Sequence, residues 1–138
     1  MLQVQINLLA ILVAAVANMV LGFLWYSPIL FGKKWLLAVG KTEDQLKSEK
    51  KGIGKTYLLT FIGALVMAYV LAHIVGYTGA TTISGGIQAG FWMWLGFVVT
   101  TSLGGLLFEK RPPAIFYITS GYYLVALIIM GAILAVWR

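Results

Sequence analysis

The chain has 138 residues, of which 61% are hydrophobic and only 10% are charged. About a quarter of the residues of a typical soluble domain are charged, so this composition excludes an ordinary soluble domain and indicates an integral membrane protein. The net charge is +6, but seven of the ten basic residues lie between Lys33 and Lys55, beside apolar segments. This cluster favours anionic lipid headgroups over nucleic acid as a partner. The absence of cysteine excludes disulfides, thiolate metal sites and thiol nucleophiles.

The first apolar segment, residues 1–32, carries no charged side chain and predicts a membrane span at 4–24. It lacks the basic start of a secretory signal, so we expect a permanent helix. Asn7 and Asn18 are separated by about three helical turns, which predicts that both lie on one buried face. Hydrogen bonds between helices are the favoured interpretation of this pair, and a polar lining for a solute path is the alternative.

An aromatic motif follows the first span and supplies the candidate functional residues Trp25, Tyr26, Ser27, Pro28, Phe31, Gly32, Lys33 and Trp35. Aromatic rings and lysines of this kind suit the headgroup region, where a chain leaves the membrane. Pro28 lacks an N–H group, so the first helix should end or kink just before it. The uncharged part of residues 29–40 is too short for a second crossing. We therefore expect this segment to lie along the membrane surface as an interfacial, amphipathic element.

Residues 33–55 form a basic loop, in which Thr42 and Gln45 make a capping-box pattern that predicts a short helix at 43–51. A second span is predicted at 56–75. Its small residues recur every four positions and should let another helix approach closely; they are Ala64, Ala68, Ala72 and Gly76.

His73, near the end of that span, is the chain's single histidine. The sequence places neither a carboxylate nor a second histidine near it. Hydrogen bonding at the membrane interface is therefore the favoured interpretation, and a role in proton or metal chemistry is the alternative.

The third and fourth spans are predicted at 87–108 and 114–137, joined by a charged turn. Glu109 borders the third span, and a carboxylate so close to hydrocarbon needs a cation or hydrogen-bond donors. We expect it to pair with Lys33 or Lys34, because both segments leave the membrane on the same side. Lys110 and Arg111 are the alternative partners.

The sequence also resembles a family of small prokaryotic four-helix membrane proteins known only as a domain of unknown function. The resemblance rests on the aromatic motif and on three later stretches, which are Phe108-Glu109-Lys110-Arg111-Pro112, Gly121-Tyr122-Tyr123-Leu124 and Met130-Gly131-Ala132-Ile133-Leu134. It covers nearly the whole chain. It implies an all-α, polytopic membrane protein that forms a single domain over residues 1–138, and a prokaryotic cell membrane as its location. It implies no activity, substrate or catalytic residue.

Three classes of function are compatible with these features. We favour a non-enzymatic module that forms homo-oligomers or docks on a larger membrane partner, because small-residue ridges on the second and third spans offer much close-packing surface. On this view, Ala68→Leu or Gly90→Leu should weaken assembly. The alternative is a homo-oligomeric transporter or channel for a small neutral or anionic solute. An enzyme is not expected, and we predict no catalytic, cofactor or metal site, since one histidine without cysteine or a buried acid supplies no reactive group.

The loops predict the orientation of the chain. The connections at 33–55 and 110–111 carry nine basic residues, whereas the opposite side carries only Arg138. The positive-inside rule therefore places these connections in the cytoplasm and both termini outside. An impermeant thiol reagent applied to intact cells should label Thr81→Cys and leave Ser48→Cys unlabelled. The reverse labelling pattern would overturn this topology.

Overall fold

A computed structural model describes residues 3–49 and 52–137. The described residues form helices and the connections between them. The helices are α1 (Leu8–Trp25), α2 (Gly32–Val39), α3 (Glu43–Ser48), α4 (Ile53–Thr78), α5 (Ile83–Met93), the π-helical segment η1 (Trp94–Val99), α6 (Thr100–Leu107) and α7 (Pro113–Val136). The backbone stays helical through Trp94 and Thr100, so α5, η1 and α6 make one continuous rod.

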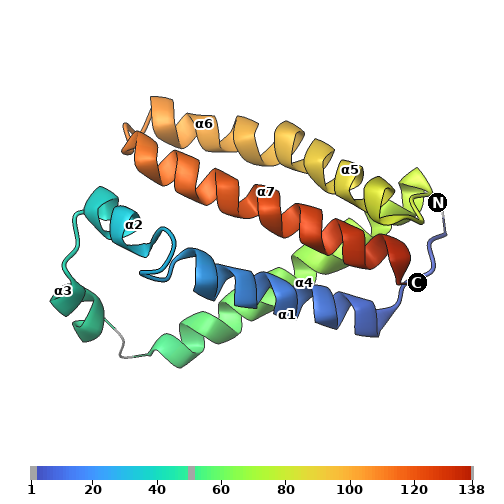
Figure 1. The fold of residues 1–138 in the computed structure, drawn as a ribbon, viewed down its shortest axis with the longest axis horizontal. Helices are drawn as coiled ribbons and strands as arrows, with labels where there is room; N and C mark the ends of the chain where they lie inside the picture. The colour runs from blue at the N-terminus through green and yellow to red at the C-terminus, as the bar shows by residue number, and fades with distance from the viewer. Residues whose placement is uncertain (1–2, 50–51, 138) are drawn as a thin grey trace.

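Within residues 3–49 and 52–137, four helices are long and apolar enough to cross a membrane, namely Leu8–Trp25, Ile53–Thr78, Ile83–Leu107 and Pro113–Val136. The predicted all-α class with four spans is therefore confirmed. The ends differ from the predicted ones by at most four residues. The start of α1 and the end of α7 lie at one end of the bundle, whereas α2, α3 and the turn after α6 lie at the other (Figure 1).

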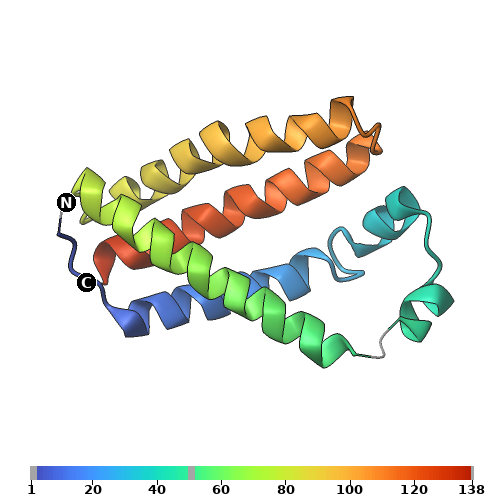
Figure 2. The ribbon, with the colours of Figure 1, turned by 180° about the vertical axis from the view of Figure 1, so that it is seen from behind.

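Helix α7 is the centre of the bundle. It lies between the α5–α6 rod and α1, and α4 crosses behind α1 and α7, as Figure 2 shows from the opposite side. Met130 of α7 is fully buried in a core formed with residues of α1, α4 and α5. Most of the other helices pack on α7. The side chains of α7 therefore line the spaces between the helices.

Glycines let α5 and α7 pack backbone to backbone. A Cβ atom at Gly90 would lie 2.7 Å from the carbonyl carbon of Leu127, and one at Gly86 would lie 2.8 Å from the Cβ atom of Ala135. On α4, Ala64 and Ala68 are buried inside the same bundle. The expected small-residue ridges therefore pack within one subunit, and the effect of Ala68→Leu or Gly90→Leu on assembly stays a prediction.

The short helices follow their local signals. The Thr42 side chain accepts a hydrogen bond from the Gln45 N–H while Gln45 bonds back to Thr42, so the predicted capping box is confirmed. Helix α3 ends at Ser48, and residues 50 and 51 of the predicted helix lie outside the described residues. The predicted interfacial element at 29–40 is helical from Gly32 to Val39 and ends at Gly40, whose φ of 73° is left-handed.

Replacing Gly90 with alanine should destabilise the bundle, because its methyl group would overlap the backbone of α7. We expect a loss of about 1–3 kcal/mol of unfolding free energy. Gly63→Ala is the matched control, since a Cβ atom there meets open space within a helix. Thermal unfolding in detergent measures both variants. Equal stability of Gly90→Ala and Gly63→Ala would contradict the close contact between α5 and α7.

Candidate functional site

The aromatic motif packs against α7. The Trp25 indole N–H donates to the carbonyl oxygen of Ile118 at 2.9 Å, and the ring fills the space beside Gly121, where a Cβ atom would lie 3.2 Å from it. The Phe31 ring packs against Trp25, with ring centroids 4.7 Å apart and the ring planes tilted by 40°. We call Trp25, Tyr26, Phe31 and Trp35 the aromatic clasp. The sequence predicted a position of these rings at the headgroup level, which stays a prediction; in addition, Trp25 and Tyr26 each form a hydrogen bond to α7.

A tight turn explains the polar members of the motif. Helix α1 ends at Trp25, as Pro28 predicts, and the Ser27 hydroxyl donates to the Leu24 carbonyl at 2.6 Å. The Gly32 N–H then donates to the Ser27 carbonyl at 2.9 Å. A Cβ atom at Gly32 would lie 2.5 Å from the Tyr26 oxygen, so only glycine fits. The turn reverses the chain and returns Phe31 to Trp25. Lys33 is exposed at the start of α2, where it can meet headgroups.

Tyr26 joins the clasp to α7 a second time. Its hydroxyl donates to the Thr119 hydroxyl at 3.5 Å, and its ring lies edge-on to Trp35 with centroids 5.9 Å apart. Desolvation raises the pKa of Tyr26 above its usual value, against a smaller opposing effect of the Thr119 hydrogen bond. The phenol therefore stays protonated and remains a donor.

Asn18 makes the interhelical hydrogen bond that the sequence favoured. It is 6% exposed, and the Tyr122 hydroxyl of α7 donates to its side-chain oxygen and lies 3.2 Å from its main-chain oxygen. Asn7 does not share this buried face. It caps the start of α1, where its side chain accepts hydrogen bonds from the N–H groups of Leu9 and Ala10. The prediction that both asparagines lie on one buried face was therefore wrong, because the helix begins after Asn7.

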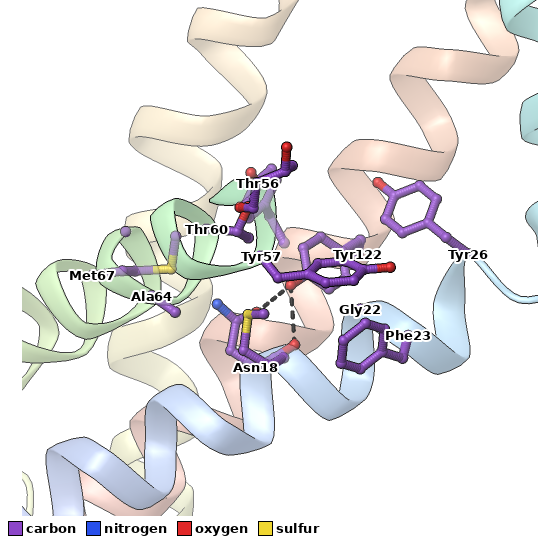
Figure 3. A pocket seen from close by; sticks show the side chains of 13 residues that line it. Asn18, Gly22, Phe23, Tyr26, Thr56, Tyr57, Thr60, Ala64, Met67 and Tyr122 are labelled. Carbon is purple, nitrogen blue, oxygen red and sulfur yellow. Dashed lines mark hydrogen bonds between the residues drawn. The ribbon is translucent and has the colours of Figure 1, made fainter. Parts of the chain in front are cut away.

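A cavity of about 490 Å³ lies beside Asn18, between α1, α4 and α7 (Figure 3). Side chains from all three helices and from Tyr26 converge on it. The lining consists of Asn18, Met19, Gly22, Phe23, Tyr26, Thr56, Tyr57, Thr60, Gly63, Ala64, Met67, Tyr122 and Tyr123. Its volume falls within the range of small-molecule sites, roughly 300–1,000 Å³. The clasp therefore borders a space large enough for a ligand.

The walls of this cavity are apolar and aromatic with a few polar groups. The amide nitrogen of Asn18 has no hydrogen-bond partner among the described residues, because Tyr122 bonds the oxygen. Figure 3 shows this nitrogen on the side that faces α4. Phe23 and Tyr57 meet edge to face at 5.3 Å, and both are about half exposed. The cavity thus opens toward the outer surface of the bundle between α1 and α4.

The remaining predicted residues lie away from this cavity. The His73 ring donates from Nδ1 to the Tyr69 carbonyl of its own helix at 2.9 Å and lies between the rings of Tyr69 and Tyr77. The Glu109 carboxylate pairs with Arg111 at 2.6 Å, and both side chains are more than half exposed. The predicted long-range pair with Lys33 or Lys34 was wrong, because a partner two residues away satisfies the acid within its own turn.

Sequence reasoning missed the cavity residues of α4 and α7, above all Thr60 and Tyr122. The available signal was a polar side chain inside an apolar span, which is costly unless it has a partner. Sequence alone could not pair Tyr122 with Asn18, since the two residues are 104 positions apart.

The bond between Asn18 and Tyr122 predicts coupled mutational effects. Asn18→Leu and Tyr122→Phe should each lower stability, and the double variant should lose less than the sum. The coupling should be about 0.6 kcal/mol and no more than about 1.7 kcal/mol. Tyr117→Phe is the control, because Tyr117 is 70% exposed on the same helix. Thermal unfolding of the wild type, the two single variants and the double variant gives a double-mutant cycle. If the two stability losses simply add, the hydrogen bond is absent.

The fold and the site can now be set beside known proteins. A search of curated proteins found no match to the chain, and a search of solved structures found none either. The model of one family, described as "Protein of unknown function (DUF1761)", matches residues 9–135. This match extends over all four spans and the aromatic clasp, and the chain belongs to this family of proteins of unknown function.

Proposed function

We propose that the protein is a non-enzymatic membrane module that binds a small neutral molecule in the cavity between α1, α4 and α7. The observation that carries this proposal is the cavity itself, with its volume of about 490 Å³ and its position beside the aromatic clasp. A transporter and an accessory module regulated by a ligand would both need to bind a small molecule. The cavity supports this binding, which the two functions have in common.

The lining favours a neutral ligand with a hydrogen-bond acceptor. None of the described residues that line the cavity is ionic at neutral pH, so a charged ligand would lose its hydration without a compensating partner. The Asn18 amide nitrogen offers a donor to a carbonyl or ether oxygen. Met19, Met67 and the ring of Phe23 suit an aliphatic or aromatic body. The ligand class is therefore a small, largely apolar molecule with an oxygen acceptor.

Filling the cavity should abolish binding. Gly63 lines it, and a side chain there starts in open space, so Gly63→Leu should occupy the cavity without disturbing the backbone. Gly54→Leu is the matched control, since Gly54 also faces open space on α4 but lies outside the cavity. Mass spectrometry of small molecules that copurify from native membranes should find a neutral compound with wild type and Gly54→Leu, but not with Gly63→Leu. Recovery of the same compounds from all three proteins would contradict the proposal.

A second observation favours assembly into homo-oligomers. Only 6% of the most apolar window of the third span is buried in the subunit, compared with 44% for α7. Gly96 and Gly104 face open space on this rod, with the exposed Thr100 midway between them. Glycine weakens a helix, so a glycine within one is favourable where another element packs closely against it. A second copy of the chain packed on this face would make that close contact.

Assembly through the third span predicts that Gly96→Leu and Gly104→Leu lower the oligomeric mass. Gly63→Leu should leave the mass unchanged, because Gly63 lies on α4 beside the cavity. Light scattering corrected for bound detergent measures the mass. A monomeric wild type in mild detergent, or an unchanged oligomer in both glycine variants, would refute this interface.

A further inference from the structure

A second cavity, of about 250 Å³, lies between α6 and α7 and shares no lining residue with the first cavity. Thr119, which bonds Tyr26 of the aromatic clasp, lies in its wall. It borders the turn that joins the two helices. The residues around it are Thr101, Ser102, Gly105, Leu106, Glu109, Arg111, Ile115, Phe116, Thr119 and Ser120. Hydroxyl groups therefore line its depth, and an ion pair lies at one end.

Within the described residues, Ser120 contributes an unpartnered hydroxyl to this cavity. The residue is 5% exposed, and its hydroxyl has no hydrogen-bond partner among the described residues. The main-chain oxygen of Ser120 is satisfied, because the Trp94 indole donates to it at 2.8 Å. A buried hydroxyl without a partner is unfavourable, since folding removes its bonds to water. A ligand in the cavity would restore the missing bond.

Charge at the end of the cavity favours an anion. Among the lining residues, the cation is Arg111, which lies beside Glu109. One guanidinium nitrogen of Arg111 binds Glu109 at 2.6 Å, and the planar group has further N–H donors for a phosphate or carboxylate. The Arg111 side chain is 61% exposed, so it can turn toward an incoming ligand.

The depth of the site fits a headgroup that carries hydroxyls. Ser120 lies nine residues after Arg111, and the seven helical positions from Pro113 to Ser120 correspond to about 10 Å along the axis. A phosphate held by Arg111 and a short polyol that reaches Ser120 would span this distance. Leu106, Ile115 and Phe116 provide apolar surface beside the path.

We propose that the cavity between α6 and α7 binds a phosphate ester with an attached polyol, with Arg111 holding the phosphate and Ser120 the hydroxyl groups. A glycerol-bearing phospholipid and a soluble polyol phosphate share this chemistry. The position of the cavity at the end of two membrane spans favours the lipid. This proposal does not depend on the cavity between α1, α4 and α7.

The test compares thermal stabilisation by phosphatidylglycerol, phosphatidylcholine and glycerol 3-phosphate in detergent. Phosphatidylglycerol should stabilise the wild type more than phosphatidylcholine does. Ser120→Ala and Arg111→Gln should each weaken its apparent affinity about tenfold or more, as expected for one lost hydrogen bond to a charged or buried group. Lys110→Gln is the matched control, since it removes a cation of the same turn that does not line the cavity.

Ser120→Ala has a second expected effect, which shows whether a weaker response to lipid comes from misfolding of the variant. Without added lipid it should be at least as stable as wild type, because it removes a hydroxyl that lacks a partner. Stabilisation by glycerol 3-phosphate equal to that by the lipid would support the same chemistry from a soluble source. Equal responses to both phospholipids, or an unchanged response in Ser120→Ala and Arg111→Gln, would overturn the proposal.

Discussion

The hydrogen bond from the Trp25 indole to the Ile118 carbonyl is the contact on which the arrangement of α1 and α7 depends. It lies at the end of α1 where Pro28 stops the helix, and it is the point at which the returning chain is pinned to α7. Gly121 leaves room for the indole and Phe31 covers it. Without this contact, the end of α1 would be free to move relative to α7. The clasp therefore fixes the angle between α1 and α7.

That angle has a consequence for the cavity. Asn18 and Tyr122 join α1 to α7 about two turns from Trp25 along α1 and about one turn from Ile118 along α7. Helix α4 crosses both helices (Figure 2). The two contacts hold α1 and α7 in place, while small residues of α1 and α4, such as Ala14 and Ala68, fill the core below. Above that core, Gly22 and Gly63 contribute no side-chain volume, and the space remains open. The cavity therefore has two causes. The contacts between α1 and α7 keep these helices from closing the space, and the two glycines have no side chains to fill it.

The sequence predicted the architecture well because hydrophobic length and charge are local properties. Four spans, the end of the first helix at Pro28 and the capping box at Thr42 could all be found from neighbouring residues. Partners distant in sequence could not be predicted in the same way. Trp25 was expected among headgroups because a tryptophan near a charged segment usually lies there, but the sequence did not show that Gly121, 96 positions later, accommodates its ring.

Polar residues illustrate the same limit. Asn7 was expected inside the first span, but its side chain satisfies the free N–H groups at the start of α1, and capping competes with burial for every asparagine near a helix end. Glu109 was expected to pair over a long distance, and Arg111 satisfied it locally. Asn18 was correctly assigned an interhelical bond, whereas its partner Tyr122 became evident only from the packing of α7.

The exchange rate of the Trp25 indole proton tests the account most directly. In protein labelled with ¹⁵N at tryptophan, the indole signal of Trp25 should persist after transfer to D₂O, because the proton is bonded to Ile118 and covered by Phe31. Trp35 provides the reference, since its indole has no hydrogen-bond partner among the described residues and it lies outside the four spans. Much slower exchange at Trp25 than at Trp35 is the predicted result. Equally rapid exchange at both positions would show that Trp25 does not hold the end of α1 on α7, and would contradict the central role given to this hydrogen bond.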